Sequence, residues 1–292
     1  MNNVTQIRPS ASIFSPDSPL YFKVCERVDG WQNKHGTWHA DPTQKKLLRQ
    51  DPVTDEPIIL ATVGNKYQTV QNRELFGAVE DSMSRIVPAQ YLDGATRSEK
   101  LSYGGAVGLH DYSFPQMRVA FNEADISFRI VARNGYGTVA VNLFAGGFDG
   151  YCLNGCVWGV AEKHYRRHTS GLQISGIDEV IQKAIENFWI EANRLKRLAD
   201  IDSPLNVEAF LQTLPKMSKR LASKLRAQYV READERGHNM WALFSAMTCY
   251  ATHNNVVPMR NTGRDHDAAT RIARSEQVAA WTRSKEWKAL AA

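Results

Sequence analysis

The sequence predicts an α+β fold in which an antiparallel β-meander with one packed helix is followed by a helical region. Before residue 160 the chain is rich in glycine, β-branched and aromatic residues, and in places apolar and polar positions alternate, which is typical of strands. After Gly171 the apolar residues recur at helical spacing, which is typical of amphipathic helices. We expect a flexible leader over residues 1–19, a β-rich α+β domain over residues 20–170 and a helical region packed on it over residues 171–292.

The first part of the β-rich domain is predicted to contain two strands. Residues 21–27 have the composition of a short strand, and residues 30–38, with two tryptophans and two glycines, are typical of a turn that joins strands. Residues 43–53 are polar and charged, which favours a surface position. Residues 57–70 are apolar on either side of the turn pair Gly64-Asn65, which predicts a strand or a hairpin.

One helix follows, and then a meander of four or five strands. Over residues 71–86 the apolar positions fall at helical spacing, and Pro88 ends the pattern. Residues 127–133 alternate strictly, and Asn134-Gly135 supplies a turn to the next strand over residues 138–144, which predicts an antiparallel hairpin. Two further strands are expected over residues 106–110 and 117–121.

The helical region is predicted to open with a long amphipathic helix. An apolar stripe extends from Ile177 to Leu198, as in a helix that packs on a core. Ser175 is the expected N-cap, and acidic residues in the first turn and basic residues in the last turn complement the helix dipole. Further helices are expected over residues 207–213, 218–236, 240–253 and about 267–290.

The composition is that of an ordinary globular protein without a membrane segment. The chain has 292 residues, of which 43% are hydrophobic and 23% charged, and no run of apolar residues is long enough for a membrane span or a signal peptide. Its four cysteines are scattered, which favours reduced, buried thiols in the cytoplasm over a disulfide scaffold. The net charge of +5 is compatible with a polyanionic partner.

Two basic segments are candidates for contact with a nucleic acid. The first joins the two halves of the chain and has an aromatic residue inside a dense group of cations, which suits a phosphate backbone and an unstacked base; its members are Lys163, His164, Tyr165, Arg166, Arg167 and His168. The alternative for this segment is a solvated loop or helix end. The second segment lacks acidic residues from Lys216 to Val230 and contains Lys216, Lys219, Arg220, Lys224 and Arg226. Its alternative is an amphipathic helix with a basic outer face.

Signals for metal or cofactor chemistry are weak. Cys152 and Cys156 lie near two histidines, but their spacing is not that of a zinc knuckle and a second cysteine pair is missing, so we expect packing rather than metal. A loose set in a polar loop, His253, Asp265, His266 and Asp267, leaves a metal-dependent nuclease open. The chain has no phosphate-binding loop, nucleophile elbow or H-E-x-x-H motif, which argues against an ordinary enzyme and against a cofactor.

Two runs of sequence resemble a known protein family. The run from Ala61 to Phe76, which reads ATVGNKYQTVQNRELF, and the run from Phe148 to Gly155, followed by Arg167-His168-Thr169, are similar to motifs of the DUF932 (UPF0380) family. The segment Met240-Trp241-Ala242-Leu243 also fits, so that the resemblance covers about residues 58–281. Members are carried by phages, prophages and conjugative plasmids, beside genes for DNA metabolism and anti-restriction. In its order of strand, helix, meander and helix the chain also resembles single-strand annealing proteins of the Red-beta type, at the level of topology only.

These observations favour a protein that binds or anneals single-stranded DNA for a phage or plasmid in the cytoplasm of a bacterial host, as a homo-oligomer. Lys163, Arg166, Arg167, Lys219, Arg220 and Lys224 would contact phosphates, with His168 beside them, and Tyr165 or Tyr67 would stack on bases. One alternative is an anti-defence or host-takeover factor that docks on a host protein, with tryptophans, especially Trp31, Trp38 and Trp158, as interface anchors, although core packing is the expected use of most of the seven. The metal-dependent nuclease is the other alternative.

Overall fold

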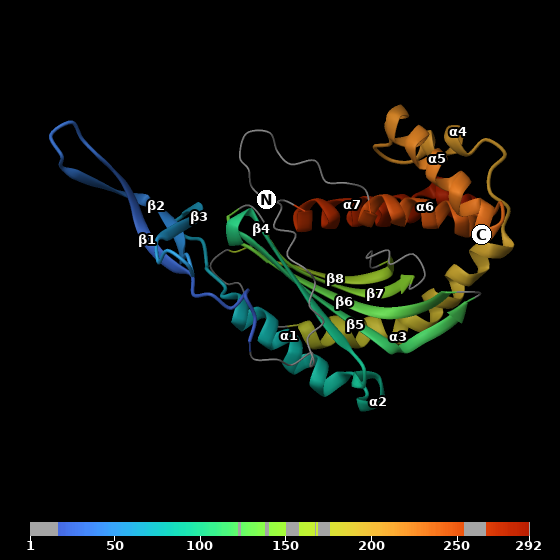
Figure 1. The fold of residues 1–292 in the computed structure, drawn as a ribbon, viewed down its shortest axis with the longest axis horizontal. Helices are drawn as coiled ribbons and strands as arrows, with labels where there is room; N and C mark the ends of the chain where they lie inside the picture. Colours follow the sequence, from blue (N-terminus) through green and yellow to red (C-terminus); the bar gives the residue numbers. More distant parts are fainter. Residues whose placement is uncertain are drawn as a thin grey trace.

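The computed structural model describes residues 17–121, 124–137, 140–149, 158–166, 168, 176–253 and 267–291. They form two antiparallel sheets, of three and five strands, together with helices that follow the sheets in the chain. This arrangement confirms the predicted α+β class. Figure 1 shows the larger sheet in the middle of the molecule, with helical layers above and below it.

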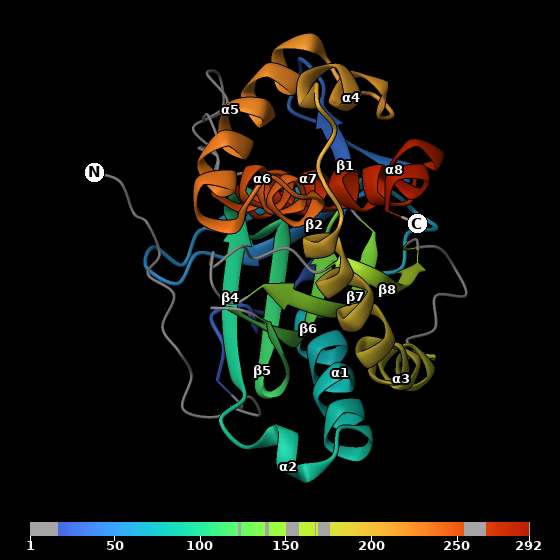
Figure 2. The ribbon, with the colours of Figure 1, turned by 90° about the vertical axis from the view of Figure 1, so that its right-hand side faces the viewer.

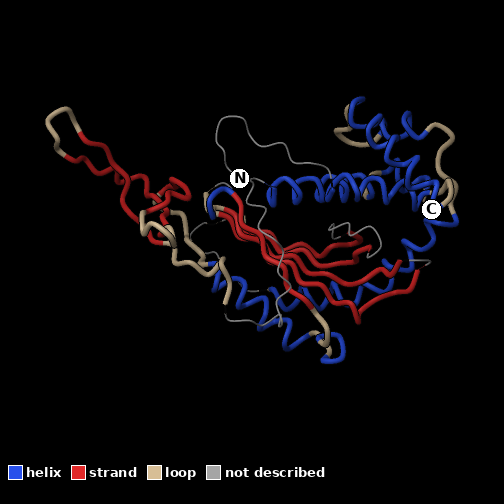
Figure 3. The backbone as a smooth tube through the Cα atoms, in the orientation of Figure 1, coloured by secondary structure: helices blue, strands red, loops and turns tan. Residues whose placement is uncertain are grey.

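The smaller sheet contains a long hairpin that stands away from the rest of the molecule. It consists of β1 (Cys25–Gln32), β2 (Trp38–Gln50) and β3 (Pro57–Gly64), in that order. We call β1, β2 and the turn of residues 33–37 between them the arm; Figures 1 and 3 show it extending beyond one end of the larger sheet.

The predicted turn of the arm is shorter than expected. Residues 33–37 form the turn that joins β1 and β2, while residues 30–32 and 38 belong to the strands. The segment at residues 43–53, predicted to lie at the surface, is mostly exposed or half-buried and contains the second half of β2. The extent of the strands was not predicted because most of the arm is open to solvent on both faces. Its strands therefore lack the apolar alternation that marks a half-buried strand.

The larger sheet is the predicted meander. Its strands pair antiparallel in sequence order: β4 (Thr96–Ser102), β5 (Val107–Phe121), β6 (Ala124–Gly135), β7 (Val141–Asp149) and β8 (Trp158–Arg166). The antiparallel hairpin predicted around Asn134-Gly135 is confirmed by the pairing of β6 with β7. The two strands expected at residues 106–110 and 117–121 form one strand, β5, with an irregular register between Phe114 and Arg118. A local irregularity of this kind interrupts the alternation without ending the strand.

Helices cover both faces of the larger sheet (Figures 1 and 2). Helix α1 (Asn72–Ile86) and helix α3 (Ile177–Lys196) lie on one face, and α7 (Asp267–Thr282) lies across the other. Two helices lie at the end of the molecule opposite the arm: α4 (Val207–Thr213) and α5 (Lys219–Arg236). Helix α6 (Met240–His253) extends from that end toward α7. The short helices are α2 (Ala89–Leu92), α8 (Lys285–Leu290) and the 3₁₀ turns Tyr103–Gly105 and Arg197–Asp200.

Most of the predicted helices are confirmed, with two corrections. The helix expected at about residues 267–290 is divided into α7 and α8, because the Ser284 hydroxyl caps a new helix by accepting a hydrogen bond from the Trp287 amide. The N-cap of α3 is Gly176 at φ 88°, and no side chain caps this helix. Among the described residues, none of the helices is long and apolar enough to cross a bilayer.

The main core lies between the larger sheet and the layer of α1 and α3. Every second residue of β6 points into it, including Phe128 and Ile130, and Phe128 meets Phe188 of α3 edge-on with ring centroids 5.5 Å apart. The predicted apolar stripe of α3 is buried as expected. The cysteines differ from the prediction: Cys25 is exposed and Cys249 is half-buried, while Cys152 and Cys156 lie outside the described residues.

Candidate nucleic-acid interface

The second basic segment forms the exposed face of α5. The helix begins after Ser218, whose hydroxyl accepts a hydrogen bond from the Leu221 amide at 3.2 Å. Leu225 and Tyr229 are buried on the inner side, toward α6. Five exposed cations lie on the helix or just before it: Lys219, Arg220, Lys224 and Arg226 within α5, and Lys216 ahead of its N-cap. We call these five residues the α5 basic face; α5 lies at the outer end of the molecule in Figure 2.

The charge order of α5 opposes its own helix dipole. Its first turn contains Lys219 and Arg220 and no acidic residue, although the amino end of a helix already carries partial positive charge. Within the described part of the chain, no carboxylate forms an ion pair with any member of the α5 basic face. A cation at this end of a helix costs about 0.3–1 kcal/mol. The unneutralised positive charge at a helix amino end is well suited to a bound anion.

The first basic segment is a strand. Residues 158–166 form β8, which ends the strand order of the larger sheet, so the loop or helix end considered as its alternative is ruled out for these residues. The backbone register pairs Lys163 with Phe144, Tyr165 with Asn142 and Arg166 with Val141. Arg167 lies outside the described residues. The backbone of Lys163, Tyr165 and Arg166 therefore lies at the edge of the larger sheet. The second basic segment lies in the helical layer, on α5.

Tyr67 and His168 pack against each other. Their rings stack at a centroid distance of 4.7 Å and an interplanar angle of 12°, and His168 is only 6% exposed. The Tyr67 hydroxyl donates to the Gly135 carbonyl and accepts from the Gly137 amide. Burial raises the pKa of Tyr67 and lowers that of His168, so both rings are neutral at pH 7.

The packing of Tyr67 and His168 argues against the nucleic-acid contacts predicted for them, which stay predictions. Each ring already uses one face on the other. Backbone groups hydrogen-bond the Tyr67 hydroxyl, and the Gln68 carbonyl lies 3.0 Å from His168 Nδ1. The pair holds the turn after β6 against the segment that precedes α1. Its role in this structure is to join elements, and the sequence alone had no signal for a stacking partner a hundred residues away.

Neighbouring residues of the same run tie the two sheets together. The Gln71 side chain makes two hydrogen bonds, both of 3.0 Å, to the backbone of Val24. The buried Asn72 side chain donates to the Leu20 carbonyl and accepts from the Asn134 side chain. Because a buried amide that loses its partner is costly, these contacts fix the smaller sheet and the N-terminal segment to α1 and β6.

A buried charged cluster lies between α1 and strands β4 and β5. Arg97, 1% exposed, forms ion pairs with Glu80 at 2.9 Å and Glu99 at 2.8 Å. The Tyr112 hydroxyl donates to Glu80 and lies 2.8 Å from Nδ1 of His110, and burial lowers the pKa of that histidine.

This cluster is closed by the N-terminal segment. Arg97 donates to the Asp17 carbonyl at 3.0 Å, and the Ser18 hydroxyl lies 3.3 Å from Nε2 of His110. Asp17 and Ser18, which we assigned to the flexible leader, are therefore held in place. With His110 fully buried, the cluster positions α1 against the sheet and offers no open site to a substrate.

The set predicted for a nuclease lies largely outside the described residues. His253 ends α6 and Asp267 begins α7, while Asp265 and His266 lie outside the described residues. Across the part of the chain that the structure covers, no group of three or more histidine, cysteine or acidic residues is placed to hold a metal ion.

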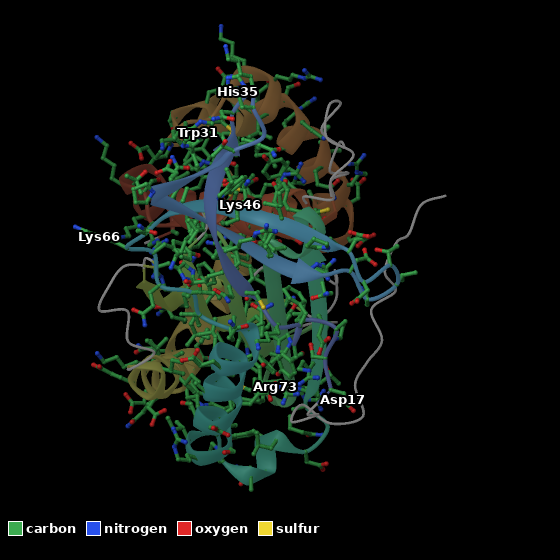
Figure 4. The ribbon with its side chains drawn as sticks, turned by 90° about the vertical axis from the view of Figure 1, so that its left-hand side faces the viewer. Asp17, Trp31, His35, Lys46, Lys66 and Arg73 are labelled. Carbon is green, nitrogen blue, oxygen red and sulfur yellow. The ribbon has the colours of Figure 1, made fainter. Side chains whose placement is uncertain are left out.

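Two tryptophans named for a protein-docking role are exposed on the arm. Trp31 is 58% exposed and Trp38 is 53% exposed, whereas Trp241, Trp281 and Trp287 are buried in the helical layer. Figure 4 shows Trp31 and His35 toward the far end of the arm and Lys46 nearer its base. Sequence reasoning identified these tryptophans only as possible anchors, because it placed them in a turn rather than on a projecting ribbon.

Comparison with known proteins gives one finding. The sequence model of a family described as "Domain of unknown function (DUF932)" matches residues 59–284. The chain matches no curated protein and no solved structure.

Proposed function

The chain belongs to the DUF932 family, and we propose that it is a single-stranded nucleic-acid-binding protein. The observation that carries this proposal is the α5 basic face: five exposed cations at and near the positive end of a helix, with no carboxylate partner among the described residues. This charge order destabilises the helix, and no ion pair among the described residues compensates for it. Binding of an external anion is the best explanation.

A nucleic-acid backbone fits this face better than a single small anion. Lys219, Arg220 and Lys224 extend over more than one turn of α5, a length that matches successive phosphates rather than one. Each lysine or arginine that neutralises a phosphate releases a condensed counterion, so binding of this kind weakens steeply as salt rises. Lys163, Tyr165, Arg166 and Arg167 remain part of the proposed interface.

We propose, more specifically, that the protein anneals single-stranded DNA as a homo-oligomer. It would do so for a phage or plasmid in the bacterial cytoplasm. The order of strand, helix, meander and helix, which supports the likeness to Red-beta-type annealing proteins, is present in the fold. The place of β8 at the end of the strand order offers an edge on which a neighbouring subunit could add. Size-exclusion chromatography with light scattering, with and without oligothymidylate, tests this part; a particle whose mass does not change on DNA binding contradicts it.

The central experiment is a salt titration of binding to a fluorescently labelled oligothymidylate, followed by anisotropy. The test variant is Lys219→Glu/Arg220→Glu/Lys224→Glu. The control, Arg194→Glu/Lys196→Glu/Arg197→Glu at the end of α3, changes the net charge equally. We expect the α5 variant to bind about 100-fold more weakly and to lower the slope of log affinity against log salt by about 2, since each single-strand phosphate contact contributes about 0.7.

Three outcomes decide the matter. The proposal is supported if the α5 variant, but not the α3 control, loses affinity and shows a smaller slope of log affinity against log salt. Circular dichroism must show that both variants are folded. No binding by the unaltered protein, or binding that is the same at about 50 and 200 mM salt, rejects it. Cleavage of the oligonucleotide in magnesium or manganese, abolished by Asp265→Ala/Asp267→Ala, would replace it with the nuclease.

A further inference from the structure

Trp31 on the arm is a fixed ring with one open face. It pairs with His39 across the hairpin, and the two rings stack with centroids 5.6 Å apart and planes 19° from parallel. His39 is itself held, because its Nε2 lies 3.1 Å from the side-chain amide of Asn33. With one face covered by imidazole, the 58% exposure of Trp31 leaves the other face free for a partner.

Trp38 is seated in a different way on the other face of the ribbon. Its indole lies against Gly30, where a Cβ atom would come within 2.6 Å of Trp38 Cζ2. Any larger residue at position 30 would therefore displace the ring. Trp38 pairs with Gln32, the residue after Trp31, and consecutive residues of a strand point to opposite faces. The arm thus presents one half-exposed indole on each side.

The turn between the two tryptophans is internally hydrogen-bonded. The Asn33 amide donates to the Thr37 carbonyl at 2.9 Å, and the Asn33 side-chain oxygen accepts from the amides of His35 and Thr37. The Gln32 side chain donates to the Gly36 carbonyl at 2.7 Å. A turn ordered in this way loses little conformational entropy on binding a partner.

Exposed cations accompany the tryptophans of the arm, and two of its three carboxylates form ion pairs. Glu26 pairs with Lys45 at 2.8 Å and Asp29 pairs with Lys46 at 2.7 Å, whereas Asp41 accepts hydrogen bonds from the amide and hydroxyl of Thr43. Arg27 and Lys34 are exposed, and neither has a carboxylate partner in the part of the chain that the structure describes. Two flat rings with cations beside them match the pattern of single-strand binding surfaces.

We infer that the arm is a base-stacking contact site for single-stranded nucleic acid, separate from the α5 basic face at the opposite end of the molecule, with Trp31 and Trp38 each receiving one unpaired base. This inference rests on the proposed function and gives the stacking role, first assigned to Tyr67 or Tyr165, to the two exposed indoles. A protein partner fits less well, because indoles on opposite faces of a ribbon do not form the single contiguous apolar patch on which protein docking depends.

The test compares two DNA probes of equal length and charge: oligothymidylate, and an oligomer whose sugars carry no bases. The variants are Trp31→Leu, Trp38→Leu and the double substitution, with Trp31→Phe/Trp38→Phe as the form that keeps flat rings. Trp189→Leu removes a tryptophan that is 37% exposed on α3 and serves as the matched control. Anisotropy gives the affinity, and quenching of tryptophan fluorescence reports stacking directly.

We expect each leucine substitution to weaken oligothymidylate binding about tenfold and the double substitution about a hundredfold. The double leucine variant should bind the base-free oligomer as the unaltered protein does and should lose most of the fluorescence quenching. The phenylalanine variant should keep most of the affinity, which would exclude misfolding as the cause of the loss in the leucine variants. Trp189→Leu should change neither the affinity nor the fluorescence quenching.

Two results would overturn the inference while leaving the proposed function intact. One is unchanged oligothymidylate affinity and quenching in the double leucine variant. The other is an equal loss of affinity for both probes, which would show that the arm acts through charge or shape and not through stacking. Failure of the unaltered protein to bind either probe would instead reject the proposed function.

Discussion

Helices α3 and α5 are similar in length and amphipathic, yet they place their charges in opposite orders. α3 has Asp178 and Glu179 in its first turn and Arg194 and Lys196 in its last. α5 begins with Lys219 and Arg220 and has no acidic residue in its first turn. The order in α3 lowers the energy of the helix itself. The order in α5 does not, which indicates that its exposed charges serve contacts outside the chain.

The two helices also differ in how they are held. α3 lies under the larger sheet, where Phe188 meets Phe128, and it has no side-chain cap. α5 packs mainly on α6 at the end of the molecule and relies on the Ser218 cap. A helix anchored in the main core can do without a cap, whereas a peripheral helix with adverse charge gains more from one.

The largest expected effect is on core anchoring. Phe188→Ala in α3 should lower the free energy of unfolding by about 4 kcal/mol, and Leu225→Ala in α5 by about 3 kcal/mol, since the larger buried ring leaves the larger cavity. Urea denaturation measures both. A smaller loss at Phe188 than at Leu225 would show that α3 is not the more firmly anchored helix.

Charge reversal in the first turns should have opposite effects on the two helices. Lys219→Glu/Arg220→Glu should raise the free energy of unfolding by about 0.3–1 kcal/mol for each charge, because glutamate suits the positive end of the dipole. Asp178→Lys in α3 should lower it, and also breaks the ion pair of Asp178 with Arg85. Repeating both measurements in about 1 M salt should shrink the changes.

The same Lys219→Glu/Arg220→Glu protein should bind oligothymidylate more weakly while it unfolds less readily. A stability gain with unchanged binding would mean that the charge order of α5 has some other cause. The free energy of unfolding and the affinity for oligothymidylate together show whether these two side chains destabilise the fold while they strengthen binding.

The cap of α5 gives a smaller effect. Ser218→Ala removes the acceptor for the Leu221 amide and should lower the free energy of unfolding by about 1 kcal/mol. Ser223→Ala, at an exposed position within α5, is the matched control and should stay within about 0.5 kcal/mol of the unaltered protein. Equal losses in the two variants would contradict the capping role.

The smallest effect concerns acid. A hydrogen bond from Lys183 holds the pKa of Glu179 below its usual value of 4.5. Because the folded-state pKa is the lower one, this contribution is present above pH 4.5 and is lost as pH falls through the folded-state pKa. Glu179→Gln should slightly flatten the acid side of a stability–pH curve measured by urea denaturation; an identical curve would show that the pair is too exposed to matter.

The helices could be predicted well because their signals are local. α4 has the predicted bounds and α5 begins one residue later than predicted, since periodicity and the Ser218 and Gly237 boundaries all lie within the segment itself. The α5 basic face was visible for the same reason. The N-cap of α3 was misassigned because Ser175 had the right residue type, and only the backbone conformation of Gly176 shows where the helix begins.

The strands and their contacts were less predictable because they depend on distant partners. The extent of the strands in the arm was not predicted, since a ribbon exposed on both faces has no apolar alternation. Tyr67 and His168 were assigned to the site because each looked suitable alone, but their stacking joins residues a hundred positions apart. The same applies to Arg97, a cation in the sequence that proves to be buried between Glu80 and Glu99.

By itself, the sequence determined the α+β class, the meander, the helices and the charge order of α5, because each follows from residue types at short spacing. The tertiary structure decided which cations and aromatic rings remain exposed. It stacked the half-buried Tyr67 on the buried His168, closed the Arg97 cluster beneath the N-terminal segment, and left Trp31 and Trp38 on a projecting arm. Exposure is a property of three-dimensional packing, and no local pattern encodes which surfaces a distant segment will cover.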